Sequence, residues 1–358
     1  MPDDPITILR NPAPAEIART PEAFLRQLDG PTLIIVEGRD PGRCRALSTL
    51  LHGNEPSGLK AIHGWLRNGE QPAVTLLCFV LSVAAALQAP LFSCRQLPGE
   101  RDLNRCFSAP FVDDSPGRIA SQTLALLDQY RPECLIDIHN TSGMNPAFGV
   151  VTHEDPVHEA LVALFTRRLI VTGIRLGALM EISRAGFPVA TIECGGNKDP
   201  AADRLAVQGL WRFLQQDSVL ELPAGGLQMD VYHHPVRLEL APDTRLVFAD
   251  EPDPAADITV PRHLERYNFG VVDRGTFLFW LGPRARSLMQ LRDAAGEDVL
   301  PQFFDCQGQR LYAAQALKLF MVTDNPLIAC SDCLLYAAPE AGHSVIDARE
   351  AEPGLKSE

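Results

Sequence analysis

Four short polar motifs in the first two thirds of the chain contain residue types that can perform chemistry. They are His52-Gly-Asn-Glu55, Asp102-Leu-Asn-Arg105, Asp137-Ile-His-Asn140 and Thr191-Ile-Glu-Cys194. His139 and Glu193 each end an apolar run that is typical of a buried strand. Ligand crevices of open α/β sheets lie at the carboxyl ends of the strands, so these motifs are the candidates for a functional site.

Two imidazoles and one carboxylate are a common ligand set for catalytic zinc, which keeps a further position open for water. His52, Glu55 and His139 could form such a set, as a closely spaced pair and one distant ligand. The His-x-x-Glu spacing alone is weak evidence, because such pairs arise by chance in polar surface loops. A histidine at a strand end is usually only hydrogen-bonded. Only the combination of motifs favours a metal site.

Composition narrows the class of protein. The 358 residues are 46% apolar, which indicates a globular chain with room for two domains. The net charge of −13 argues against a nucleic-acid partner, because an acidic surface repels phosphates. The 9 cysteines are odd in number and scattered, which predicts reduced thiols in the cytoplasm. The N-terminus does not resemble a signal peptide, and the most apolar run, 74–87, is shorter than the ~20 residues of a membrane span.

Alternating short apolar runs and helical stretches predict an α/β sheet covered on both faces. The expected strands are 32–38, 74–80, 134–139, 148–153 and 188–193. Ser115 before Pro116 and Asp199 before Pro200 are expected N-caps, each followed by proline at the first helical position.

The sequence pattern changes after Gln216, where a stretch with one proline and two glycines is followed by short apolar runs. We therefore expect a catalytic α/β domain at 1–220 and a β-rich C-terminal domain at 221–358. Cys330 and Cys333 form an isolated Cys-x-x-Cys pair, for which two reduced cysteines in a turn is the favoured interpretation. His233 and His234 would point to opposite faces of a strand, which disfavours a shared metal ion.

HGNEPSG at 52–58, DLNR at 102–105, a strand ending in DIHN and a later strand ending in Glu193 occur in that order. Together they resemble the succinylglutamate desuccinylase/aspartoacylase family, a branch of the zinc-carboxypeptidase-like fold. The resemblance covers roughly residues 30–216 and includes a β-rich C-terminal segment. It implies a mixed sheet covered by helices on both faces, followed by a smaller β-rich domain. It also implies a zinc-dependent deacylase that hydrolyses the amide bond of a small N-acyl amino acid.

The resemblance assigns roles to individual residues. One zinc ion per chain would be held by three ligands: His52, Glu55 and His139. Glu193 would be the general base, and Asn104 and Arg105 would hold a substrate carboxylate. Asp102 would orient a zinc-ligating histidine. Arginine suits the carboxylate role because its planar fork binds both oxygens.

Several positions depart from the family pattern. Arg184, nine residues before Glu193, is the candidate for a second carboxylate-binding arginine, although its offset is one residue short. Arg95 and Arg101 both compete for the arginine that stabilises the oxyanion, and Arg95 is preferred because Arg101 adjoins Asp102. Ser82 and Val83 replace the usual Asn-Pro turn, and three tyrosines compete for a C-terminal substrate contact: Tyr267, Tyr312 and Tyr336.

Two alternatives stay open. A metallocarboxypeptidase acting on short peptides would use the same zinc and Asn-Arg arrangement. A non-catalytic zinc-binding protein is a different class, and the intact Glu193 argues against it. The expected partner is a small N-acyl amino acid, with no membrane contact. The sequence does not determine the acyl group, the amino acid or whether the chain forms a homo-oligomer.

Overall fold

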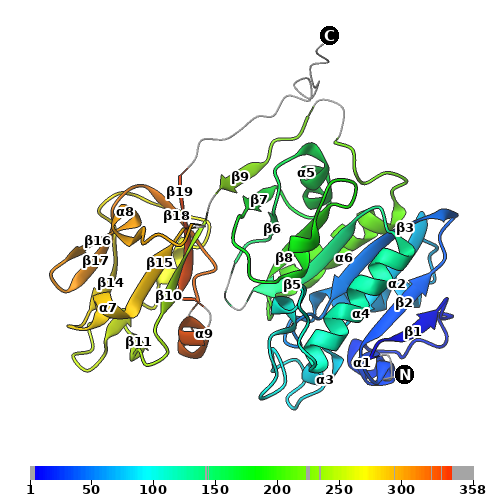
Figure 1. The fold of residues 1–358 in the computed structure, drawn as a ribbon, viewed down its shortest axis with the longest axis horizontal. Helices are drawn as coiled ribbons and strands as arrows, with labels where there is room; N and C mark the ends of the chain where they lie inside the picture. Colours follow the sequence, from blue (N-terminus) through cyan, green and yellow to red (C-terminus); the bar gives the residue numbers. More distant parts are fainter. Residues whose placement is uncertain are drawn as a thin grey trace, which may run out of the picture.

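The computed structural model describes residues 5–340 except 142, 144, 223–225, 234, 294, 324 and 332. Within these residues the chain forms two lobes (Figure 1). A large lobe is built on a nine-stranded mixed sheet, and a second lobe, called here the β lobe, contains two five-stranded sheets.

The large sheet has the strand order β1-β2-β4-β3-β5-β8-β6-β7-β9. Its strands are β1 (Thr7–Arg10), β2 (Thr32–Val36), β3 (Asp40–Thr49), β4 (Val74–Val80), β5 (Leu135–Thr141), β6 (Phe148–Val151), β7 (Arg168–Val171), β8 (Val189–Gly196) and β9 (Asp230–His233). The helices of this lobe are α1 (Pro21–Leu28), α2 (Ser57–Asn68), α3 (Val83–Ala86), η1 (Leu103–Arg105), α4 (Ser115–Tyr130), α5 (Pro156–Ala163), η2 (Leu179–Ile182) and α6 (Pro200–Gln215).

Helices cover both faces of the large sheet. Successive side chains of β2 show this, because they point to opposite faces and pack with different helices. Ile34 packs with Leu59 of α2 on one face, where α1, α5 and α6 also lie. Leu33 and Ile35 point to the opposite face and pack with Ala120 of α4. A strand buried on both faces reads as a continuous apolar run, which is why 32–36 was recognisable in the sequence. The predicted fold class is confirmed.

Both predicted helix starts exist, but one N-cap was misplaced by a residue. The carboxylate of Asp199 accepts from the Ala201 N–H at the start of α6, as predicted. At the start of α4 the cap is Asp114, which accepts from the Gly117 N–H at 2.8 Å. Ser115 is the first residue inside the helix. A carboxylate is also favoured here by the helix dipole.

The strand that delivers the first candidate ligands was not predicted. β3 spans Asp40–Thr49, and its first five residues, DPGRC, are mostly exposed and contain proline and glycine. This polar start hid the apolar pattern of its buried second half. β3 lies between β4 and β5 and runs parallel to both.

The β lobe consists of two sheets with the strand orders β13-β18-β19-β10-β15 and β11-β12-β14-β17-β16. Its strands are β10 (Val236–Leu240), β11 (Leu246–Phe248), β12 (Ile258–Val260), β13 (Val271–Val272), β14 (Phe277–Leu281), β15 (Met289–Arg292), β16 (Phe304–Gln307), β17 (Arg310–Ala313), β18 (Leu317–Phe320) and β19 (Leu335–Pro339). Its short helices are η3 (Leu264–Tyr267), α7 (Ala285–Leu288), α8 (Leu300–Phe303) and α9 (Pro326–Ser331).

An aromatic cluster joins the two lobes. Phe148 and Tyr232 of the large sheet are buried together with Phe320 of β18. Phe269 of the β lobe lies between them, with its ring centroid 4.8 Å from Phe148 and 5.6 Å from Phe320. The domain division at 220/221 stays a prediction, and β9 follows that point in the chain while pairing with β7 in the large sheet.

The described residues bear on the expectations about membrane spans and disulfides. In the part of the chain that the structure covers, no helix combines the length and the apolar character needed to cross a bilayer. All nine cysteines fall in this part and none is joined in a disulfide.

Candidate metal centre and active site

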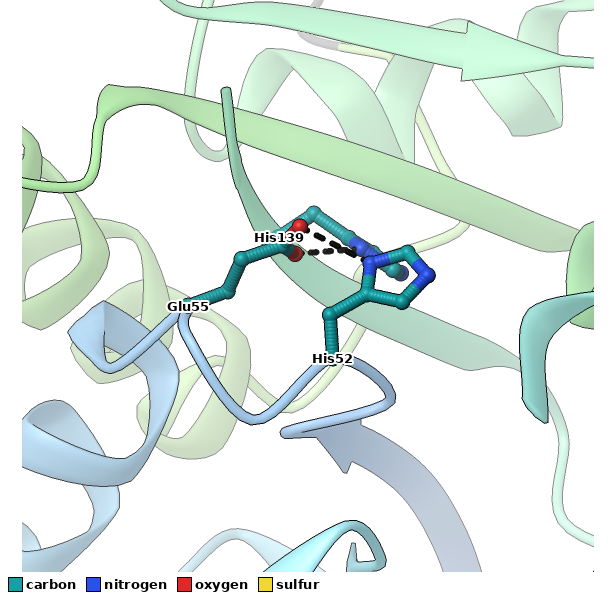
Figure 2. Close-up of side chains that lie close together, drawn as sticks. All are labelled: His52, Glu55 and His139. Carbon is teal, nitrogen blue, oxygen red and sulfur yellow. Dashed lines mark hydrogen bonds and ion pairs between the residues drawn. The ribbon is translucent and has the colours of Figure 1, made fainter. Parts of the chain in front are cut away.

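Two chain segments bring the candidate ligands to the carboxyl edge of the large sheet. β3 leads directly into the turn that holds His52 and Glu55, and α2 begins after it. β5 runs parallel to β3 in the neighbouring position, so His139 near its carboxyl end reaches the same edge. Figure 2 shows the three side chains pointing toward one another from the turn and the strand.

The turn before His52 is held in an unusual conformation. Leu50 has a φ of 52°, in the left-handed region that a leucine rarely adopts. Ser82 fixes this turn, since its N–H donates to the Leu50 carbonyl at 2.7 Å and its hydroxyl to the Leu51 carbonyl at 2.8 Å. Ser82, which departs from the family pattern, therefore supports the segment that presents His52.

The three candidate ligands form one compact buried cluster. Oε1 of Glu55 lies 2.8 Å from Nδ1 of His52, and Oε2 lies 2.7 Å from Nδ1 of His139 (Figure 2). One ligand atom from each residue lies within 4.8 Å of the others. All three side chains are buried. The residues that sequence spacing singled out are thus brought together with donor atoms that suit zinc.

Each imidazole also contacts a second carboxylate through its other nitrogen. Nε2 of His52 lies 3.0 Å from Asp102, and Nε2 of His139 lies 2.7 Å from Asp137. A neutral imidazole carries only one N–H, so it cannot donate to two carboxylates at once. If Nε2–H donates to the aspartate, the lone pair of Nδ1 faces the Glu55 carboxylate. A cation between Nδ1 and the carboxylate would remove that repulsion, so the donor set fits a metal ion.

The charges in the cluster shift the pKa values in opposite directions. Burial raises the pKa of Glu55, but His52 and His139 outweigh it and hold that pKa well below its usual range. Burial also opposes ionisation of Asp102, while the hydrogen bond from His52 lowers the Asp102 pKa strongly. Burial lowers the pKa of His139, but Asp137 and Glu55 raise it well above its usual value. The carboxylates therefore create a strong demand for positive charge at this point.

Glu193 lies beside this cluster on the neighbouring strand. It is the register partner of His139 in the parallel pair β5 and β8, so the two side chains share one face of the sheet. Its Oε2 is buried and makes no hydrogen bond to the residues that the structure describes. Burial, partly offset by the charge of His139, raises the pKa of Glu193 to about 7. A carboxylate in this state can accept and release a proton near neutral pH.

Asn104 and Arg105 lie on η1, next to the carboxylate that contacts His52. The Asp102 side chain accepts from the Asn104 N–H at 2.8 Å and so caps this short helix. Oδ1 of Asn104 accepts from the Leu179 N–H, which turns the NH₂ group away from Leu179. Arg105 is half-buried, and its charge helps to lower the pKa of Asp102. The DLNR motif therefore lies at the site.

The structure separates the two arginines that compete for the oxyanion role. Arg95 donates to Oδ2 of Asp102 through Nε at 3.2 Å and Nη2 at 2.9 Å. Its Nη1 lies 3.6 Å from Oε1 of Glu55. Arg101 forms a two-pronged ion pair with Asp114 at 2.7 and 2.8 Å, at the start of α4. Arg95 is thus the arginine beside the cluster.

The sequence also predicts Arg184 as a carboxylate-binding residue. Arg184 is exposed, stacks 5.5 Å from the Phe187 ring and precedes the amino end of β8, whereas Glu193 lies toward its carboxyl end. Val189, the first residue of β8, lies four positions before Glu193, on the order of 13 Å along the strand. The predicted role of Arg184 in binding a carboxylate stays a prediction.

The remaining candidates belong to other surroundings. Tyr312 contacts Phe277, and Tyr336 stacks on Phe320, both through β-lobe packing. Tyr267 packs against the β-lobe core. His233 lies 2.6 Å from Glu154, and His234 lies outside the described residues. The thiol of Cys330 faces the carbonyl of Thr244, and Cys333 is buried.

Sequence reasoning missed the role of Asp137. Its side chain is completely buried and lies against His139, two residues along the same strand. Alternate residues of a strand share a face, so the Asp-x-His spacing was the available signal.

No protein-family model matches the sequence, and no curated protein matches it. Among solved structures, the chain is similar to a succinylglutamate desuccinylase/aspartoacylase from Rhodobacter sphaeroides, at 16% identity and a TM-score of 0.55, over 86% of this chain and 88% of that one. The product-bound ectoine utilization protein EutE from Ruegeria pomeroyi gives 18% identity and 0.57, over 86% and 88%.

Murine aminoacylase 3 gives 20% identity and a TM-score of 0.53, over 84% of this chain and 96% of that one. At 16–20% sequence identity, this similarity is one of fold. It covers 84–86% of this chain and therefore includes both lobes. This chain therefore has the fold of the succinylglutamate desuccinylase/aspartoacylase proteins, which its motifs also resemble.

Proposed function

We propose that this protein is a zinc-dependent amidohydrolase that removes the acyl group from a small N-acyl amino acid. The observation that carries the proposal is the position of Glu193, a buried carboxylate with a raised pKa beside a cluster of metal-ligand type. His52, Glu55 and His139 would hold one zinc ion. When bound there, zinc would activate a water molecule and polarise the substrate carbonyl.

The residues around the cluster would bind the substrate, transfer the proton and stabilise the developing charge. Arg105 and the Asn104 NH₂ group would bind the substrate carboxylate and so place the amide bond. Glu193 would take the proton of the attacking water and pass it to the leaving nitrogen. Arg95, whose guanidinium lies beside Glu55 and Asp102, would stabilise the negative charge that develops on the carbonyl oxygen. Arg184 stays the predicted second carboxylate-binding arginine.

A contact between the lobes supports a small substrate. Asn145 lies in the segment that follows β5, and its Oδ1 accepts from the Met321 N–H of the β lobe at 3.2 Å. The β lobe therefore abuts the chain just beyond His139. A site bordered in this way favours small acylated amino acids over peptides, which a metallocarboxypeptidase would cleave. The cytoplasmic location stays a prediction.

The deciding experiment measures hydrolysis of a panel of N-acyl amino acids, short peptides and esters by the zinc-loaded protein. We expect amide hydrolysis of one or more N-acyl amino acids to exceed peptide cleavage. Peptide cleavage alone would replace this proposal with a metallocarboxypeptidase. Zinc binding without hydrolysis of any class would indicate a binding protein.

The Glu193→Gln variant tests the mechanism within the same assay. Glutamine keeps the size of the side chain but cannot accept the proton of water, so we expect kcat to fall by ~10²–10⁴-fold. Zinc content and the midpoint of thermal unfolding should stay near those of the wild type. Loss of zinc would make Glu193 a ligand, and full activity would place the base elsewhere.

A further inference from the structure

A buried asparagine connects the three segments that build the proposed site. Asn140 follows His139 on β5, and its backbone N–H donates to Oε2 of Glu55 at 3.2 Å. Its side-chain Nδ2 donates to the carbonyl of Gly195 on β8 at 3.1 Å and to the hydroxyl of Ser57 at 2.9 Å. Its Oδ1 accepts from the Ser57 N–H at 3.1 Å. Every donor and acceptor group of this side chain is used.

The connection continues from Ser57 to the surface of the large lobe. Ser57 is completely buried at the start of α2, and its hydroxyl donates to Oδ1 of Asp203 on α6 at 2.7 Å. The other oxygen of Asp203 accepts from Lys60 of α2 at 2.7 Å. The side chains of Asp203 and Lys60 are about one-third exposed, at 32% and 31%.

The direction of these hydrogen bonds is fixed. Because the Ser57 hydroxyl accepts from Asn140, its own hydrogen is directed to the Asp203 carboxylate. A hydrogen bond to an ionised acceptor is stronger than a neutral one, and neighbouring bonds in such a chain polarise one another. An aspartate on α6 therefore strengthens the hold of Ser57 on Asn140.

We infer that Ser57 and Asp203 are positioning residues that set the distance between Glu55 and Glu193 by acting through Asn140. Glu55 precedes Ser57 by two residues, and Gly195 follows Glu193 by two residues on β8. A shift of Asn140 would therefore move the proposed metal ligand and the proposed base relative to each other. The inference rests on the proposed function for its kinetic part.

The same geometry predicts which kinetic constant changes. Asn104 and Arg105, which would bind the substrate, lie on η1 and take no part in the hydrogen bonds that link Asn140 to Asp203. Loss of these bonds should lower kcat and weaken zinc binding while KM stays unchanged. A smaller folded fraction would also lower the apparent kcat at unchanged KM. Both kcat and zinc affinity are therefore expressed per folded protein, with the folded fraction measured by circular dichroism.

The test compares Ser57→Ala and Asp203→Ala with Lys60→Met as the matched control. The first two remove a hydrogen bond of the chain, and the control removes the ion pair of Asp203 but keeps its bond to Ser57. Zinc affinity of the apoprotein is measured by competitive titration with a chelator, and kcat and KM are measured on the best amide substrate.

We expect Ser57→Ala and Asp203→Ala each to reduce zinc affinity and kcat by about 10-fold or more, the usual size of an effect on residues that orient metal ligands. Lys60→Met should stay within about 2-fold of the wild type in both, on the scale of an exposed ion pair. Wild-type zinc affinity in both alanine variants would overturn the inference, as would equal losses in Lys60→Met and Asp203→Ala. Should Ser57→Ala fail to fold, Asp203→Ala at its part-exposed position decides. If the wild type hydrolyses no amide, the proposed function fails, and the zinc affinities still decide the inference.

Discussion

Arg45 offers the sharpest test of what holds the large lobe together. Its side chain is 1% exposed, and its guanidinium caps the end of α6. Nη1 donates to the carbonyls of Phe213 at 2.9 Å and Gln216 at 2.7 Å, and Nη2 donates to that of Asp217 at 2.8 Å. Nε contacts Glu133 in a short ion pair. Arg45 thus connects the middle of β3 to the last turn of α6.

The Arg45→Met variant keeps most of the side-chain volume and removes all of these donors. The buried carbonyl of Phe213 would lose its partner at roughly 1–3 kcal/mol. The carbonyls of Gln216 and Asp217 belong to exposed residues and would lose less, so the whole loss is about 2–3 kcal/mol. Glu133 keeps its contacts with Arg43, at 3.0 and 2.7 Å, and contributes little to the loss.

Arg43 supplies the matched control, because it binds the same carboxylate from a position that is 43% exposed. Arg43→Met should cost about 0–1 kcal/mol. The free energy of unfolding of both variants is measured by urea titration followed by circular dichroism. Equal losses in the two variants, or a loss below about 1 kcal/mol for Arg45→Met, would refute the argument that burial and the carbonyl contacts determine the difference.

Three further predictions concern the proposed site. Asp137→Asn should weaken zinc binding by about 10–100-fold, since the amide can no longer hold His139 in the tautomer that directs a lone pair to the metal. Competition with a chelator measures the zinc affinity, and an unchanged affinity would contradict the tautomer argument. Removal of zinc should lower the midpoint of thermal unfolding in calorimetry, because zinc at 100 times its Kd would stabilise the native state by about 2.7 kcal/mol; identical midpoints with and without chelator would speak against the site. Arg105→Lys should raise KM about 10-fold or more for substrates with a free carboxylate, because hydrogen bonds to charged groups are worth about 1.5–3 kcal/mol; equal losses on the corresponding amides would point to a structural role.

The sequence was sufficient for the parts of the site that depend on short spacing. His52 and Glu55 share one turn, and His139 ends an unmistakable apolar strand, so their convergence followed from sheet geometry. The sequence favoured Arg95 over Arg101 only because Arg101 adjoins Asp102. The contacts that place the two arginines, with Asp102 and with Asp114, depend on the path of a loop that no local pattern predicts. β3 escaped prediction for a local reason, because its exposed start contains proline and glycine and hides the apolar pattern of its buried end.

The role of Asn140 shows a second limit. Its side chain acts through Ser57 and Gly195, which are 83 and 55 residues away in the chain. Nothing in the local sequence distinguishes an asparagine with such partners from one in a surface turn. The role of Arg184 stays a prediction, because spacing along the chain does not determine where a residue that precedes β8 directs its side chain.

The aromatic cluster between the lobes constrains how this chain could have evolved. Phe148 and Tyr232 belong to the large sheet, whereas Phe269 and Phe320 belong to the β lobe, and all four pack as one set. Neither lobe could be exchanged for an unrelated module without exposing large aromatic surfaces on the other. Substitutions at these four positions should therefore occur together in descendants of this chain, and the two lobes should be inherited as a single unit.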